Sequence, residues 1–258
     1  MSNDYKESFE QMKVAGNLAA ETLDEVTSYV KPGVTTNKLD KICYEFINDN
    51  KGYSAPLFYR GFPKSCCTSV NHVICHGIPT EKYLNDGDII NIDVTAIVNG
   101  WHGDTSRMFF VGDVSVKSKN LVSTTYNSMM KGISIIKNNL PLGDIGEAIQ
   151  TYAEKKGFSV VRDFSGHGIG KIFHEPPNIL HYGKKGSGMR LKTGMIFTVE
   201  PMINEGKYDT KLLKDGWTAV TKDKSLSAQF EHTVGVTNDG FEIFTKSKKN
   251  YEQPPYLI

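Results

Sequence analysis

The apolar positions near the N-terminus recur at the three- and four-residue steps that are typical of an amphipathic helix. Over residues 7–30 these positions are Phe9, Met12, Ala15, Ala19, Leu23 and Val26. A Pro32-Gly33 breaker follows, and Thr36 or Asn37 can cap a second helix carrying further apolar residues on one face. The pattern predicts a pair of helices at the start of the chain.

A second copy of this arrangement follows at residues 118–157, which again predict a helix, a breaker and a second helix. The segments after each pair correspond more closely, since residues 76–78 and 167–169 both read His-Gly-Ile. Residues 84–93 and 191–200 share Leu, Gly and Ile at the same places, and each segment closes with an acid. These echoes in the same order predict an internal duplication.

The duplication predicts one α/β (α+β) catalytic domain at residues 1–246, built from halves at about 7–112 and 113–246. A pseudo-twofold axis would relate the halves, so that equivalent residues face one another where the strands meet. Residues 247–258 are polar, basic and contain proline, which predicts a flexible tail. The glycine- and lysine-rich run at 181–188 predicts a flexible surface loop.

Two predicted buried strands close with an acid, although burying a carboxylate is costly unless it is paired or binds a metal. Asp93 closes one strand and Glu200 closes its duplicate. From Asp93 the chain turns at residues 99–100 and returns to Asp104, a hairpin spacing that places these two acids nearly opposite each other. Glu231 is the weaker echo of Asp104, so four carboxylates are predicted to converge.

His167 and His174 lie in one glycine-rich segment and add two imidazoles to this set. Any single acid here is more often a satisfied structural group, but four acids at duplicated positions favour a metal site. Carboxylates and imidazoles without thiolates suit divalent cobalt, manganese, iron or zinc, and not a cysteine-closed structural zinc site. Two such ions, about 3.5–4 Å apart, would balance four negative charges and are typical of hydrolases.

Composition narrows the class of protein further. The 30 basic and 29 acidic residues leave a net charge of +1, so no strong field indicates a nucleic-acid or anionic membrane partner. No signal peptide and no run of about 18 apolar residues is present, so no membrane span is expected. The cysteines at 43, 66, 67 and 75 form no CxxC pair, which predicts reduced thiols in the cytoplasm.

Seven sequence blocks, in order along residues 7–246, resemble those of the type I methionine aminopeptidases. The blocks lie at residues 71–79, 91–95, 102–106, 165–170, 173–177, 197–202 and 227–233. The resemblance implies a monomeric hydrolase with the pita-bread fold, an antiparallel sheet covered by helices. The internal pseudo-twofold of that fold agrees with the repeat in the sequence.

The resemblance also implies a ligand for each metal. Asp93 would chelate one ion, Asp104 and Glu231 would bridge both, and His167 and Glu200 would hold the other. The family is further expected to bind a monovalent cation through backbone oxygens near residues 71, 73 and 227, a kind of site that leaves no side-chain signature.

For catalysis, the resemblance implies that Glu200 manages the proton of the attacking water, His174 stabilises the oxyanion and His76 contacts the scissile amide. An apolar pocket would take the methionine side chain. The matching pocket positions are Tyr59, Phe62, Cys67, Phe173 and Trp217. Each of these aromatic residues, taken alone, would more often be ordinary core. Pro56 stands where relatives commonly have a cysteine.

The implied substrates are the N-termini of nascent polypeptides, which the enzyme would bind while transiently close to the ribosome. The interval between His174 and Glu200 is too short for the helical subdomain of type II relatives, and no N-terminal extension is evident, so a bacterial-type enzyme is expected. Two alternatives stay open: a proline-specific peptidase of the same fold, and a non-catalytic peptide-binding protein built on that fold.

Overall fold

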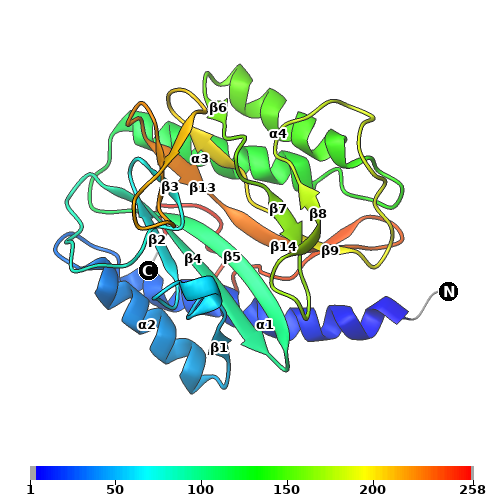
Figure 1. Cartoon of the computed structure of the whole chain (residues 1–258), viewed down its shortest axis with the longest axis horizontal. Helices are drawn as coiled ribbons and strands as arrows, with labels where there is room; N and C mark the ends of the chain where they lie inside the picture. Colours follow the sequence, from blue (N-terminus) through cyan, green and yellow to red (C-terminus); the bar gives the residue numbers. More distant parts are fainter. Residues whose placement is uncertain (1–3, 257–258) are drawn as a thin grey trace.

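Residues 4–256 are described in the computed structural model, which contains both of the predicted helical pairs (Figure 1). The helices are α1 (Asp4–Val26), α2 (Thr36–Asp49), α3 (Val116–Ile133) and α4 (Leu142–Lys155). A 3₁₀ turn at Thr27–Tyr29 extends α1. The cap of α2 is Thr35 and not the predicted Thr36 or Asn37, because the Thr35 side chain accepts a backbone N–H of the first turn.

The strands form one large antiparallel sheet and two small ones. They are β1 (Tyr53–Ser54), β2 (Cys67–Val70), β3 (Val73–Cys75), β4 (Ile89–Val98), β5 (Trp101–Phe110), β6 (Ser159–Val160), β7 (Gly166–Gly168), β8 (Glu175–Ile179), β9 (Ile196–Val199), β10 (Met202–Asn204), β11 (Thr210–Leu212), β12 (Ala219–Thr221), β13 (Ser227–Gln229), β14 (Glu231–Val236) and β15 (Phe241–Ile243). The large sheet has the order β1-β4-β5-β14-β9-β7-β8, with β2 added on β4 and β15 on β14. The small sheets are β13-β10-β6 and β11-β12-β3.

The two halves of the chain meet between β5 and β14, the central pair of the large sheet. Outward from this pair, β4 lies next to β5 and β9 lies next to β14. The strands that close with an acid therefore occupy equivalent places on either side of the junction. This arrangement is the pita-bread fold, and its symmetry agrees with the duplication read from the sequence.

The β4-β5 hairpin has the register that the sequence predicts. Asn99 and Gly100 connect the strands with φ values of 52° and 77°, the positive angles of a type I′ turn. Asp93 has Ser106 as its cross-strand partner, so Asp104 lies two residues beyond that position on β5. Residues two apart on a strand point to the same face, so both acids face the same side of the sheet.

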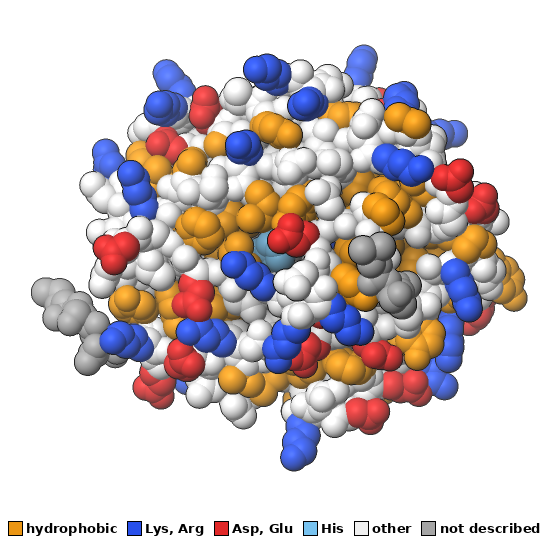
Figure 2. All heavy atoms as spheres, turned by 180° about the vertical axis from the view of Figure 1, so that it is seen from behind, with side chains coloured by type: hydrophobic (Ala, Val, Ile, Leu, Met, Phe, Trp, Pro, Cys, Tyr) orange, Lys and Arg blue, Asp and Glu red, His pale blue; other side chains and the backbone are white. Residues whose placement is uncertain are grey.

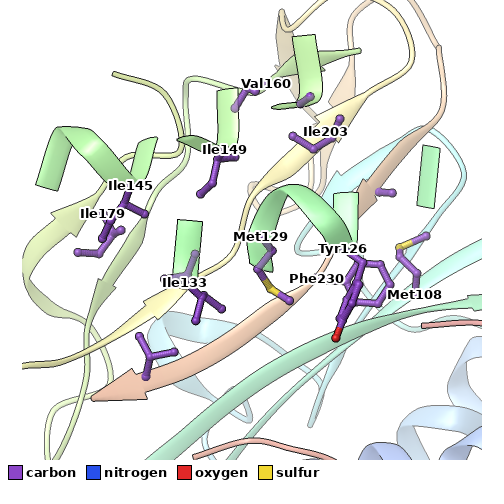
Figure 3. Close-up of a cluster of buried hydrophobic side chains, with 14 of the residues drawn as sticks. Met108, Tyr126, Met129, Ile133, Ile145, Ile149, Val160, Ile179, Ile203 and Phe230 are labelled. Carbon is purple, nitrogen blue, oxygen red and sulfur yellow. The ribbon is translucent and has the colours of Figure 1, made fainter. Parts of the chain in front are cut away.

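Each half has its own apolar core between its helices and the sheet. In the first half, Leu23, Leu39 and Ile92 are fully buried where α1 packs against β4 and β5 and α2 packs against α1. In the second half, Met129 and Ile149 are fully buried between α3, α4 and the sheet (Figure 3). Each such side chain contributes about 1.5–3 kcal/mol of burial free energy, so the packing of the helical pairs stabilises the sheet.

Residues 247–256 differ from the flexible tail that their polar composition predicts. The Ser247 hydroxyl donates to Oδ1 of Asp24 at 2.7 Å, and Asp24 is ion-paired with Arg107 in the interior. The Tyr256 hydroxyl donates to the Met108 carbonyl at 2.9 Å. Single hydrogen bonds to Asp24 and Met108 in the first half therefore fix the position of this segment. Composition does not reveal such contacts. Residues 257 and 258 of the predicted tail lie outside the described part.

No helix between residues 4 and 256 is long and apolar enough to cross a membrane. On the face shown in Figure 2, basic and acidic side chains are interspersed and do not gather by sign. This distribution agrees with the near-neutral charge of the sequence.

Candidate active site

The predicted carboxylates come from the four central strands of the large sheet. Asp93 lies on β4, Asp104 on β5 and Glu231 at the start of β14, and Glu200 directly follows β9. Because these strands are neighbours in the sheet, their acids line one pocket together with His167 of β7. The structure thus brings together all five residues that the sequence predicts as metal ligands.

Asp104 is held in place from both halves. A Cβ on the preceding Gly103 would lie 2.3 Å from the backbone of Ala15, so only glycine lets α1 lie this close to β5. The Thr233 hydroxyl donates to the Asp104 carbonyl at 2.7 Å, across the junction of the halves. The Thr95 hydroxyl donates to the Asp104 carboxylate at 2.7 Å and orients it toward the pocket.

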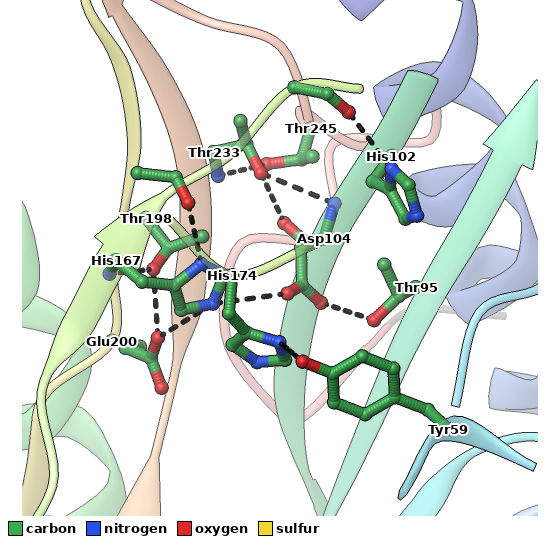
Figure 4. A network of polar contacts seen from close by, with 12 residues as sticks. Tyr59, Thr95, His102, Asp104, His167, His174, Thr198, Glu200, Thr233 and Thr245 are labelled. Atoms are coloured by element: carbon green, nitrogen blue, oxygen red, sulfur yellow. Dashed lines mark hydrogen bonds and ion pairs between the residues drawn. The ribbon is translucent and has the colours of Figure 1, made fainter. Parts of the chain in front are cut away.

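His167 presents Nε2 to the acids (Figure 4). This atom lies 3.6 Å from Asp104 Oδ2 and 3.6 Å from Glu200 Oε1. On the other side of the ring, Nδ1 lies 3.1 Å from the Gly168 carbonyl oxygen, which can only accept a hydrogen bond. In the neutral ring the Nδ1 atom therefore carries the proton, and Nε2 is the nitrogen available to a metal in the site.

The electrostatics of the pocket reflect several acids in one buried place. Burial raises the pKa of Asp93 and of Glu231 well above its usual range, and the neighbouring carboxylates raise it further. Burial also raises the pKa of Glu200 to about 7, although His167 opposes this shift. Burial opposes the charge of His167, but its hydrogen bond to Asp104 and the charges of Glu200 and Asp104 outweigh burial and raise its pKa to about 9.

This donor set fits divalent metal ions. Ligand atoms of Asp104, His167 and Glu231 all lie within 4.8 Å of one another, and Asp93 and Glu200 line the same pocket. Buried acids that repel one another are costly to the fold unless cations offset their charge. Oxygen and imidazole ligands without a thiolate ligand suit manganese, iron, cobalt or zinc.

Two further predicted histidines, His76 and His174, line the pocket beside the acids. His76 has a left-handed backbone with φ of 55°, which an L-residue adopts only when its surroundings impose it. Burial lowers the pKa of His76, and burial together with the nearby His167 lowers the pKa of His174 to about 4. Both imidazoles are therefore neutral near pH 7 in the metal-free protein.

An apolar recess adjoins the acids in the same cavity, whose volume is about 340 Å³. Its wall contains the five residues that the sequence assigns to the methionine pocket, namely Tyr59, Phe62, Cys67, Phe173 and Trp217. Phe62 and Trp217 pack edge to face with ring centroids 5.2 Å apart. Pro56 also lines this cavity.

Sequence reasoning missed several residues that support the site. The His181 ring is buried, and its Nε2 accepts the Glu200 backbone N–H at 3.0 Å, although the sequence predicts a flexible loop from this residue onward. Thr198 donates to Glu200 Oε1 at 2.8 Å, and the Gln229 amide donates to Glu200 Oε2 at 3.3 Å. The sequence could have indicated Thr198, because it lies two residues before Glu200 and residues two apart on a strand share a face. No such pattern indicated His181.

Known proteins resemble this chain in sequence and in structure. A methionine aminopeptidase of Rickettsia prowazekii is 62% identical over 252 residues, which are 97% of each chain. A methionine aminopeptidase of Escherichia coli K12 is 52% identical over 244 residues, covering 94% of this chain and 92% of that one. The crystal structure of the Rickettsia prowazekii enzyme superposes with a TM-score of 0.92 at 63% identity, covering 93% and 97% of the two chains.

The fold and the cluster of acids with an imidazole define a metallopeptidase. The sequence model of metallopeptidase family M24 matches residues 10–238, and the chain belongs to that family. Within the family, its similarity is to the bacterial methionine aminopeptidases and extends over nearly the whole chain.

Proposed function

We propose that this site removes the N-terminal methionine from proteins and peptides by hydrolysing the first peptide bond with two divalent metal ions. The observation that carries the proposal is the convergence of four carboxylates and His167 beside an apolar recess. More than 50% identity to methionine aminopeptidases over nearly the whole chain supports the same substrate. Both halves contribute ligands, so residues 1–246 act as one catalytic unit.

In this proposal Asp93 would hold one ion, His167 and Glu200 would hold the other, and Asp104 and Glu231 would supply the remaining carboxylates of the site. When bound, the ions supply a hydroxide nucleophile near neutral pH and polarise the scissile carbonyl. The buried ligand set of the described site supports two ions, because one divalent cation would leave the four carboxylates with a large excess of negative charge.

The remaining steps belong to side chains of the pocket. Glu200 accepts the proton of the attacking water, and its position among Thr198, Gln229 and His181 fixes its two oxygens and its backbone. His174 donates to the oxyanion of the tetrahedral intermediate. His76 contacts the scissile amide.

Substrate choice follows from the recess. A methionine side chain fits a wall of aromatic rings with Cys67 beside them, because a thioether packs well against aromatic faces. We expect a small second residue to be preferred. A monovalent cation near residues 71, 73 and 227 is also part of the proposal, and the Ser227 N–H, which donates to the Asn71 carbonyl at 2.9 Å, draws these backbones together.

The substrates place this activity in the cytoplasm, where nascent chains leave the ribosome and expose their N-termini. The four cysteines support this assignment, because all are buried free thiols, as expected in a reducing compartment. Contact with the ribosome would be transient in this proposal, and neither a nucleic acid nor a membrane is a specific partner.

A peptide assay tests the function. The purified protein is incubated with Met-Ala-Ser, Met-Leu-Ser, Pro-Ala-Ser and Ala-Pro-Ser, with and without cobalt, manganese, iron or zinc, and the released amino acids are measured. Metal-dependent release of methionine, faster from Met-Ala-Ser than from Met-Leu-Ser, is expected. Cleavage only before proline would indicate a proline-specific peptidase, and no release with any metal would favour a peptide-binding protein.

The variant His174→Ala should turn over Met-Ala-Ser roughly 10²–10³-fold more slowly, because one donor to the oxyanion is lost. The KM should change much less than kcat, since the ground-state carbonyl gains little from this donor. Steady-state kinetics with matched metal loading measure both constants. Unchanged kinetics would assign His174 a structural role.

The variant Trp217→Ala should weaken the preference for methionine over other first residues more than it weakens metal binding. Trp217 packs against Phe62 in the recess. Its truncation therefore enlarges the recess and leaves the carboxylates unchanged. Competition between Met-Ala-Ser and peptides with smaller first residues measures the preference, and elemental analysis measures bound metal. Loss of metal with an intact preference would contradict this placement.

A further inference from the structure

Tyr59 and His174 approach each other from opposite sides of the site (Figure 4). The hydroxyl oxygen of Tyr59 lies 3.0 Å from Nδ1 of His174. Tyr59 belongs to the first half of the chain and His174 to the second, so this contact joins the two walls of the pocket. The ring nitrogen left for a substrate is Nε2.

We propose that Tyr59 is a positioning residue whose O–H donates to Nδ1 of His174 and thereby keeps the imidazole proton on Nε2, where it is available to the substrate carbonyl. The proposal rests on the proposed function, because it assigns a purpose to the Nε2 proton during hydrolysis. It goes beyond the role of Tyr59 as a wall of the methionine recess.

The direction of the hydrogen bond follows from what each group can do. A neutral imidazole has one nitrogen that donates and one that accepts, and a phenol hydroxyl can do either. Among the described residues, this is the only hydrogen bond of the Tyr59 hydroxyl. If Nδ1 donated, the phenol proton would have no protein acceptor, and Nε2 would present a lone pair that repels an oxyanion.

The neighbouring His167 shows the opposite arrangement. Its Nδ1 faces the Gly168 carbonyl oxygen, which can only accept, so the proton stays on Nδ1 and Nε2 is free to bind a metal. Nδ1 of His174 faces a hydroxyl, which can donate, so the proton moves to Nε2. The group that faces Nδ1 thus selects the neutral tautomer of each ring. The Gly168 carbonyl keeps the proton of His167 on Nδ1, and the Tyr59 hydroxyl keeps the proton of His174 on Nε2.

Backbone contacts within the loop that carries Tyr59 fix the position of this residue. Backbone hydrogen bonds close the loop on itself, from Tyr59 N–H to the Pro56 carbonyl at 2.9 Å and from Phe58 N–H to the Phe62 carbonyl at 2.8 Å. Phe58 and Arg60, on either side of Tyr59, have left-handed φ values of 67° and 48°. L-residues adopt such angles only when the fold imposes them, and loops of this kind gather at functional sites.

Two further contacts fix the Tyr59 ring. It packs against Phe173 with centroids 4.9 Å apart, and the Arg60 guanidinium carbon lies 5.3 Å from its centroid. A cation over the ring draws electron density from the phenol, which favours the hydroxyl as a donor. A donor that is held in position before the reaction needs no reorganisation when charge develops on the substrate.

The variant Tyr59→Phe tests the proposal, because it removes the hydroxyl and keeps the ring in the recess. We expect kcat for Met-Ala-Ser to fall by roughly 10–100-fold, as is typical when a partner that orients a catalytic group is lost. KM and the preference for methionine should stay close to those of the wild type. In a His174→Ala background, Tyr59→Phe should have no further effect on kcat, because the group it positions is gone.

A spectroscopic readout separates positioning from a general structural effect. The ¹⁵N shifts of the His174 ring in metal-free protein near neutral pH, assigned by their loss in His174→Ala, should show protonated Nε2 and unprotonated Nδ1. Tyr59→Phe should move these shifts toward a mixture of tautomers, whereas Tyr53→Phe, whose parent residue is 71% exposed on β1, should leave them unchanged.

Two results would overturn the proposal: protonated Nδ1 in the wild type, or a Tyr59→Phe variant with unchanged ring shifts and unchanged kcat. If the wild type releases no methionine with any metal, the proposed function fails instead. The ring spectra need no turnover, so they still decide which tautomer Tyr59 selects in that case.

Discussion

Glu200→Gln is expected to lose nearly all aminopeptidase activity while keeping the fold. Loss of the group that we propose to accept the proton of the attacking water should lower kcat by roughly 10²–10⁴-fold, and the lost charge should weaken binding of one of the proposed ions as well. Glutamine retains the shape of the side chain, so the hydrogen bond from Thr198 at 2.8 Å can be kept. Steady-state kinetics on Met-Ala-Ser, with bound metal measured in the same preparation, test this expectation.

Glu205→Gln is the matched control for this substitution. Glu205 lies five residues further along the chain, is ion-paired with Lys117 and does not line the active-site pocket. The control should keep wild-type activity, and both variants should unfold at temperatures close to that of the wild type when metal is present. Near-normal turnover by Glu200→Gln would remove this residue from the mechanism.

The sequence predicted the central geometry well because duplication and alternation are visible in residue order. Asp93 and Glu200 occupy the same place in two matching segments, and Asp104 follows Asp93 at hairpin spacing. A strand pair with a type I′ turn has a fixed register, so the position of one acid gives the position of the other. The family resemblance then supplied the pocket residues, such as Trp217, which no pattern of the sequence distinguishes from core.

Other features depend on contacts that residue order does not encode. The support that His181 gives Glu200 joins two segments 19 residues apart, and the bond from Ser247 to Asp24 joins segments 223 residues apart. Each is a single hydrogen bond. The run that begins at His181 is rich in glycine and lysine, and Ser247 lies between lysines, so composition predicted loops there. Such contacts appear only when the chain is folded, because packing of the large cores decides which distant segments meet.

Metal removal should abolish turnover and make the stability of the protein depend on pH. In the metal-free protein, burial raises the pKa of Glu200 from 4.5 to about 7 and the pKa of Glu231 well above its usual range. A carboxyl group with a raised pKa binds more protons in the folded state than in the unfolded state. The free energy of unfolding therefore falls as pH rises from about 4.5 through about 7.

His167 acts in the same direction at higher pH. Its pKa is raised from 6.5 to about 9, so the stability that it contributes is complete below pH 6.5 and is lost as pH rises through about 9. Bound divalent ions would remove this loss of stability at rising pH, because they bind the deprotonated ligands and only in the folded state. Thermal unfolding of chelator-treated protein across this pH range, before and after metal is restored, measures the slope.

The variant Glu231→Gln separates the cost of the buried charges from other effects of chelation. In metal-free protein at the alkaline end of the range, it should unfold several degrees above the wild type, since a buried charge that repels its neighbours is gone. With metal added it should be inactive, because one of the proposed metal ligands is lost. Asp113→Asn, whose parent side chain is 90% exposed, should match the wild type in both respects. A metal-free wild type that gains stability with rising pH, or a Glu231→Gln variant that is less stable than it, would contradict the view that these acids are assembled at the expense of the fold in order to hold metal.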